Sequence, residues 1–234
     1  MQIPEFINNH LLGAIVTIVS SIFVWHWASN RNESFTHMVN PEIFLDQITK
    51  LDYFKYSDKK DTSLIYEALN NSLIKNKGLE TAYFEGAIIP MDYRLYPLNE
   101  NDLTEKGGLS KSLKLIKHTF NKLSIPFLYT NESMKIDGNQ IVCRIDVNDK
   151  EYIFFAGKDS IKKNGIVLKN LADMLNDQLL MNKSNERVFL ISKQENGHII
   201  FLTKELQKNI ALVIKNKNIQ PLYPTMWAKW NQLI

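Results

Sequence analysis

The longest apolar run in the chain lies near its start, from Leu11 to Ala28, and contains no charged residue. Its length is close to the shortest helix that spans a bilayer core of about 30 Å. Trp25 and Trp27 stand at its C-terminal edge, where amphipathic aromatic side chains favour the membrane interface. The pattern therefore predicts a single transmembrane anchor that presents these side chains to lipid: Leu11, Ile15, Ile18, Ile22, Trp25 and Trp27.

Two other interpretations of this segment remain open, a cleaved secretory signal peptide and a buried helix of a globular domain. A signal peptide begins with basic residues, whereas residues 1–10 contain neither Lys nor Arg. The basic residues follow the apolar run, beginning at Arg31, which favours a cytoplasmic position for the rest of the chain. We therefore expect an N-terminal tail over residues 1–10 and a retained anchor over residues 11–28.

Helical patterns follow the anchor. Asn40-Pro41 is a typical helix start, because Asn caps the first turn and Pro fits the first helical position. A second helix is expected from about Thr62 to Lys75, with Asp61 as its cap. We interpret residues 30–76 as a juxtamembrane helical connector.

The pattern changes after Gly78 to short runs rich in β-branched and aromatic residues. Strands are expected over residues 81–89, 141–147 and 152–155, a hairpin over 187–203, and a helix from Lys204 to about Lys215. The sequence thus predicts an α+β fold in which a transmembrane helix and a short connector precede a β-rich, membrane-adjacent domain over residues 78–215. Residues 216–234 form an aromatic C-terminal segment.

Composition narrows the class of protein. The chain has 234 residues, of which 44% are hydrophobic and 23% charged, which is typical of a globular protein. A formal net charge of only +3 argues against a dedicated nucleic-acid binder. The single cysteine, Cys143, excludes an internal disulfide and a cysteine-cluster zinc site.

The chain contains none of the usual nucleotide, dinucleotide, zinc-protease or serine-hydrolase motifs. Cys143 is a candidate nucleophile with His118 or His198 as its base, but its alternation with apolar neighbours favours a buried thiol. Glu85 before Gly86 is a candidate acid, although a strand glycine more often marks a bulge. We expect no catalytic residue, no metal and no cofactor.

Two groups of residues are candidates for lipid or partner contact. Lys111, Lys114 and Lys117 belong to a basic run interleaved with apolar residues, which also suits a solvated helix face. Trp227 and Trp230 end the chain in a short amphipathic segment that docks on a partner or a membrane, or else covers the domain's own core. We expect a membrane and an unidentified protein as partners, and no nucleic acid.

The order of the elements resembles the Mulan/GIDE family, whose membrane-adjacent domain is also called BAM, for "beside a membrane". The resemblance covers roughly residues 60–215 and is carried by Tyr83 with Glu85-Gly86-Ala87, and by Ile125-Pro126-Phe127. Animal members are ubiquitin or SUMO ligases of the mitochondrial outer membrane, with a C-terminal RING. The resemblance implies that location in a eukaryote, and an inner or plasma membrane in a bacterium.

A RING needs about eight Cys and His ligands, and this chain has no cysteine near its C-terminus. The resemblance therefore implies a non-catalytic module that binds proteins or lipids at a membrane surface. Two alternatives stay open: a RING-less relative or fragment of a membrane E3 ubiquitin ligase that needs a RING in trans, and a secreted protein released by signal cleavage.

Overall fold

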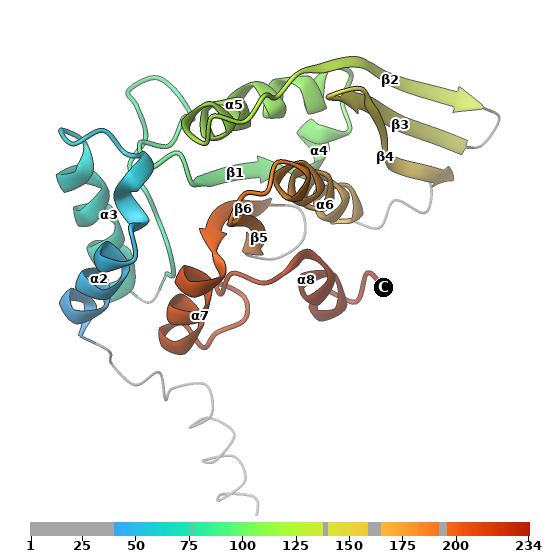
Figure 1. Ribbon diagram of the computed structural model, residues 1–234. Coiled ribbons are helices and arrows are strands. Elements are labelled where there is room, and N and C mark those ends of the chain that lie inside the picture. The colour runs from blue at the N-terminus through green and yellow to red at the C-terminus, as the bar shows by residue number, and fades with distance from the viewer. Residues whose placement is uncertain (1–39, 76, 138–139, 159–164, 192–195) are drawn as a thin grey trace, which may run out of the picture. The chain divides into compact units, whose positions relative to one another are not determined.

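The computed structural model describes residues 40–75, 77–137, 140–158, 165–191 and 196–234 (Figure 1). Residues 40–234 form one compact unit. Its helices are α2 (Pro41–Lys50), η1 (Tyr53–Tyr56), α3 (Thr62–Ile74), α4 (Glu100–Leu103), α5 (Gly108–Lys122), α6 (Ile166–Met181), α7 (Lys204–Val213) and α8 (Pro224–Trp230). Its strands are β1 (Leu95–Asn99), β2 (Tyr129–Asp137), β3 (Gln140–Val147), β4 (Lys150–Lys158), β5 (Glu186–Ile191) and β6 (Asn196–Thr203).

The described fold is α+β, but the predicted single-pass membrane architecture is wrong. Within the ranges given above, no helix is both long and apolar enough to cross a bilayer. The longest of them, α6, has 16 residues and carries charged side chains. The six predicted anchor residues, Leu11, Ile15, Ile18, Ile22, Trp25 and Trp27, lie outside the described residues. The expected single-pass location, mitochondrial or bacterial, is corrected by the same finding.

The first sheet has three antiparallel strands in the order β1-β6-β5. Val188 and Phe201 belong to the main core cluster, and Phe189 and Ile200 beside them in the chain are equally buried. Because successive strand residues point to opposite faces, both faces of this sheet are covered. Pro97 lies in β1 at the sheet edge, where a missing N–H breaks no hydrogen bond between strands.

The second sheet is an antiparallel meander in the order β2-β3-β4. Ile141, Cys143, Ile145 and Val147 alternate toward the core, as the sequence pattern predicted. Helix α6 packs against both β4 and β5 and so joins the two sheets. This helix was not predicted, although Leu168, Leu171, Leu175 and Leu179 repeat at helical spacing.

The C-terminal segment is part of the same core. Trp227 on α8 is 1% exposed and packs in the main cluster, and α8 contacts α6 and β5. Gly165 has a φ of +98°, and a Cβ at this position would lie 2.8 Å from side-chain atoms of Trp227 and Leu233. A glycine is therefore required where α8 closes over the start of α6.

Both helices predicted for the connector are present as α2 and α3. Asn40 caps α2 through its Oδ1, which accepts a hydrogen bond from the amide N of Glu42 at 2.9 Å. Asp61 stands at the N-cap of α3 but makes no capping hydrogen bond. Helix α2 contacts α7, so a helix at the start of the described chain lies beside one near its end (Figure 1).

The predicted strand over residues 81–89 is wrong. This segment forms a turn closed by one isolated bridge between Tyr83 and Pro90, and Gly86 at its tip has a φ of +69°. Its β-forming residues find no neighbouring strand among the residues that the structure describes, and Ile88 stays 60% exposed. Strand propensity needs a pairing partner before it becomes a sheet.

A buried arginine connects the helical connector to the first sheet. Arg94 is fully buried, and its Nη1 lies 3.2 Å from Oε2 of Glu186 at the start of β5. The same guanidinium donates hydrogen bonds to three backbone carbonyls, those of Asp52, Tyr53 and Phe201. It therefore joins the α2–η1 segment to β5 and β6.

Two tyrosines of η1 complete this cluster. The Arg94 guanidinium lies over the rings of Tyr53 and Tyr56, and the Tyr56 hydroxyl donates to Oε1 of Glu186 at 2.8 Å. Burial raises the pKa of the Tyr56 hydroxyl well above its ordinary value, and the Glu186 carboxylate adds to this. Burial also raises the pKa of the nearby Asp92 carboxyl, against the backbone N–H groups whose hydrogen bonds it accepts. Arg94 and Glu186 are thus paired, and the Asp92 carboxyl is hydrogen-bonded.

Replacing Glu186 with alanine is expected to lower the free energy of unfolding by about 3–5 kcal/mol, because Arg94 then stays buried without its counter-charge. Urea denaturation followed by tryptophan fluorescence measures the loss. The matched control is Glu151→Ala, which breaks the exposed 2.9 Å pair with Arg144 and should cost about 0–1 kcal/mol. Equal losses in the two variants would contradict the assigned role of Glu186.

Candidate functional site

Helix α5 carries four lysines and no acidic residue in its 15 positions. Its opposite side is fixed in the core by Leu113, Ile116 and Phe120, among others. Lys111 and Lys114 are exposed and Lys117 is half-buried. We call these three lysines the basic face; at helical geometry they extend over about 9 Å.

The basic face has no ion-pair partner among the residues that the structure describes. The fourth lysine of the helix, Lys122, differs: its Nζ lies 3.1 Å from Oδ1 of Asp58 and 4.8 Å from the centre of the Tyr93 ring. The structure therefore brings the sequence-predicted contacts Lys111, Lys114 and Lys117 together on one helix, as a cationic surface without an ion pair to another described residue.

A hollow of about 450 Å³ opens at the N-terminal end of α5. We call it the α5 hollow. Its walls are mostly apolar, with Leu103, Leu109 and Cys143 buried and Met134 39% exposed. Lys106 and Lys135, both exposed, also line it.

The N-terminus of α5 is already occupied by a carboxylate. Glu132 of β2 accepts hydrogen bonds from the amide N of Leu109 at 3.3 Å and of Ser110 at 2.9 Å. A negative charge at this position is stabilised by the helix dipole and the free N–H groups. The α5 hollow therefore offers apolar walls and a charged rim, and its helix end is not open to another anion.

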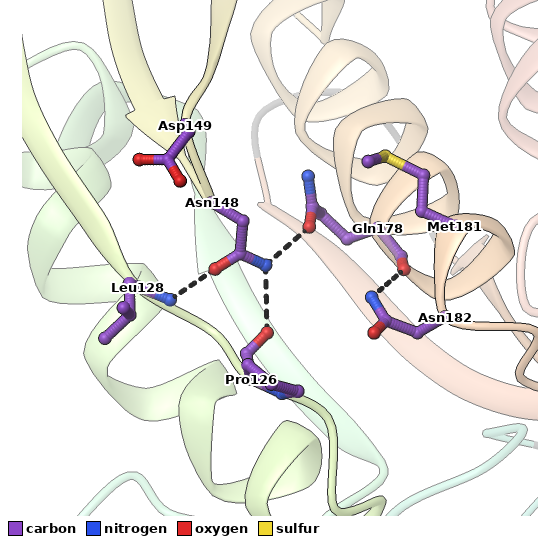
Figure 2. Close-up of a pocket in the computed structure, with 7 residues that line it drawn as sticks. All are labelled: Pro126, Leu128, Asn148, Asp149, Gln178, Met181 and Asn182. Atoms are coloured by element: carbon purple, nitrogen blue, oxygen red, sulfur yellow. Dashed lines mark hydrogen bonds between the residues drawn. The ribbon is translucent and has the colours of Figure 1, made fainter.

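A second hollow, of about 400 Å³, lies between the β3–β4 turn and the end of α6 (Figure 2). We call it the turn hollow. Asn148 and Asp149 form the turn with φ of +47° and +64°, a geometry that Asn and Asp tolerate better than most residues. Leu128 and Met181, 65% and 58% exposed, stand at its sides.

The polar groups of the turn hollow bond to one another. The Asn148 side chain donates to the carbonyl of Pro126 and to Oε1 of Gln178, and its Oδ1 accepts from the amide N of Leu128 (Figure 2). Gln178 in turn donates to the Tyr152 hydroxyl at 2.7 Å. These bonds join the turn to α6, and we call the hydrogen-bonded group the joint. The polar groups of the turn hollow therefore serve the structure and are not free to bind a ligand.

A charged pair borders this joint. Lys150 Nζ lies 2.6 Å from Oδ2 of Asp177, and the Tyr152 hydroxyl donates to the same oxygen. The hydrogen bond from Lys150 lowers the pKa of the Asp177 carboxyl. The arrangement holds β4 to α6 and leaves no free base or nucleophile among these three side chains.

The structure places the candidate catalytic residues on four different elements, with His118 on α5. Cys143 is 6% exposed in β3, with Met134 and Phe155 as its neighbours across the sheet. His198 belongs to the other sheet, where burial lowers its imidazole pKa. Glu85 is exposed in the turn over residues 81–89. Within the described ranges, no group of three or more His, Cys, Asp or Glu side chains could hold a metal ion.

The two tryptophans that the sequence suggested as contact residues differ in exposure. Trp227 lies in the core, as the alternative interpretation of this segment expected, whereas Trp230 is 47% exposed with Lys217 Nζ 5.0 Å from its ring centre. Sequence reasoning missed the α5 hollow, because Leu103, Met134 and Cys143 are far apart in the chain. The only local sign of the α5 hollow in the sequence is Met134, an apolar residue within the polar run NESMK.

No family model matches this chain, and no curated protein or solved structure matches it. The resemblance to the Mulan/GIDE domain thus stays a prediction.

Replacing Asn148 with alanine is expected to lower the free energy of unfolding by about 2–4 kcal/mol, since three hydrogen bonds are lost and alanine disfavours a positive φ. Asn148→Gly separates these causes, because glycine adopts this backbone freely and should recover part of the loss. Urea denaturation of both variants measures the difference. A wild-type midpoint for Asn148→Ala would show that the joint contributes nothing to stability.

Proposed function

We propose that this chain is a non-catalytic protein-binding module and that the basic face of α5 contacts an acidic partner. The observation that carries the proposal is the charge pattern of α5, with three neighbouring lysines free of ion-pair partners in the described chain and no acid in the helix. Solvated lysines are common on protein surfaces, but they are usually interspersed with acids. A one-sign stripe on a rigid element favours a complementary, negatively charged surface.

A protein partner fits this surface better than a nucleic acid. The net charge is only +3 and the three lysines extend over about one and a half helical turns, or about 9 Å. A nucleic-acid groove typically combines a longer cationic track with exposed aromatic side chains for stacking. The outer side of α5 carries lysines and one histidine, His118, with no exposed aromatic ring.

The resemblance described from the sequence points to the same class of function. In the Mulan/GIDE family the corresponding domain is not thought to be the catalytic part. The candidate nucleophile Cys143 lies in one sheet, whereas the candidate bases lie on other elements, His118 on α5 and His198 in the other sheet, which also favours a binding role over the catalytic alternative.

Charge reversal of the basic face tests the proposal. The triple variant Lys111→Glu/Lys114→Glu/Lys117→Glu is expected to bind a fluorescein-labelled deca-glutamate peptide at least tenfold more weakly than wild type. Each tenfold corresponds to about 1.4 kcal/mol, which three charge contacts at the protein surface can supply. Fluorescence anisotropy at two salt concentrations measures the affinity, and the wild-type value should fall as salt rises.

The matched control reverses three exposed lysines elsewhere, Lys204, Lys208 and Lys215, on and after α7. It removes the same net charge, so its affinity should stay within about threefold of wild type if the site is α5. If both triple variants lost affinity equally, the effect would come from net charge alone, and the assignment of the binding site to α5 would be wrong. Equally tight binding of a single-stranded DNA decamer would also overturn the assignment to an acidic protein.

A further inference from the structure

The α5 hollow adjoins the basic face along the same helix. Gly107 lines the hollow and precedes α5, and Lys111 lies four residues further on, about 6 Å along the helix axis. A chain segment that contacts the basic face therefore reaches the mouth of the hollow within two or three residues of extended backbone.

The α5 hollow differs from the turn hollow in the character of its walls. Its volume of about 450 Å³ lies within the range of about 300–1,000 Å³ that is usual for ligand pockets. Leu103 and Leu109 are 2% exposed, Cys143 is 6% exposed, and together they make an apolar wall. Met134 forms the accessible side, and a methionine side chain adapts readily to an incoming apolar group.

The exposed lysines at the mouth of the α5 hollow favour a ligand group that is flanked by acidic residues. Lys106 and Lys135 are exposed there. Of the two acids that line the hollow, Glu132 is held by the N-terminus of α5, and Glu105 alone remains exposed. Together with the basic face, the cationic groups outnumber the free carboxylates along this end of α5.

We propose that the α5 hollow receives one bulky apolar side chain of the acidic partner, whose flanking carboxylates contact Lys106, Lys111 and Lys135. The partner is thus an acidic segment with an aromatic or large aliphatic anchor. This inference rests on the proposed function, and it names the partner chemistry that a charged helix face alone leaves open. Anchors of this kind, inserted in a pocket and ringed by charge pairs, carry much of the affinity of many protein interfaces.

Two labelled peptides of equal charge test the anchor directly. One has a central phenylalanine with four glutamates on each side, and the other has alanine in place of the phenylalanine. The phenylalanine peptide is expected to bind wild type at least fivefold more tightly in fluorescence anisotropy, because burial of the ring adds apolar contact. The variant Met134→Gln keeps the charge and approximate size of the wall but makes it polar. This variant should bind both peptides with the weaker affinity of the alanine peptide.

The control variant is Met226→Gln, which changes a methionine that is 54% exposed on α8, and it should keep the full preference for phenylalanine. Circular dichroism and urea midpoints verify that both variants fold. Equal binding of the two peptides to wild type would overturn the anchor while leaving the basic face in place. A preference that survives Met134→Gln would place the anchor elsewhere, and failure of both peptides to bind would overturn the proposed function itself.

Discussion

The burial of one guanidinium is the constraint on which the arrangement of the described chain depends. Arg94 precedes β1, yet its hydrogen bonds extend to Tyr53 in η1, to Glu186 at the start of β5 and to Phe201 in β6. A charge removed from water must find partners at every donor, because the cost of an unpaired buried ion is several kcal/mol. The cluster therefore ties the α2–η1 segment to β5 and β6 of the first sheet.

The same requirement positions the candidate binding surface. Once the first sheet is fixed, Phe201 packs edge-on against Phe120 of α5, and Phe120 stacks on Phe127 before β2. These contacts lock the apolar side of α5 and leave Lys111 and Lys114 in solvent. A cationic surface on a helix that is held this firmly loses little conformational entropy on binding beyond that of its own side chains.

Several elements were predictable because their signals are local. Residues that are close together in the sequence are enough to predict four of them: the cap at Asn40, the turn at Asn148-Asp149, the β5–β6 hairpin and α7. Residues 81–89 and α6 show the limit of that reasoning. Residues 81–89 are rich in β-forming residues but have no strand beside them in the described part of the chain. Helix α6 has a helical repeat of leucines, but other apolar residues between them obscure the repeat.

The sequence by itself determined the cap at Asn40, the β5–β6 hairpin, the amphipathic character of the run that forms α5 and the buried position of Cys143. Only the tertiary structure decided which polar groups are buried and which distant residues share a surface. It placed Trp227 in the core and left Trp230 exposed, although the two lie three residues apart, because α8 turns one side toward Gly165. It also joined Leu103, Met134 and Cys143 in one hollow. Such outcomes depend on contacts between segments, and the free energy of burial is settled only when the segments meet.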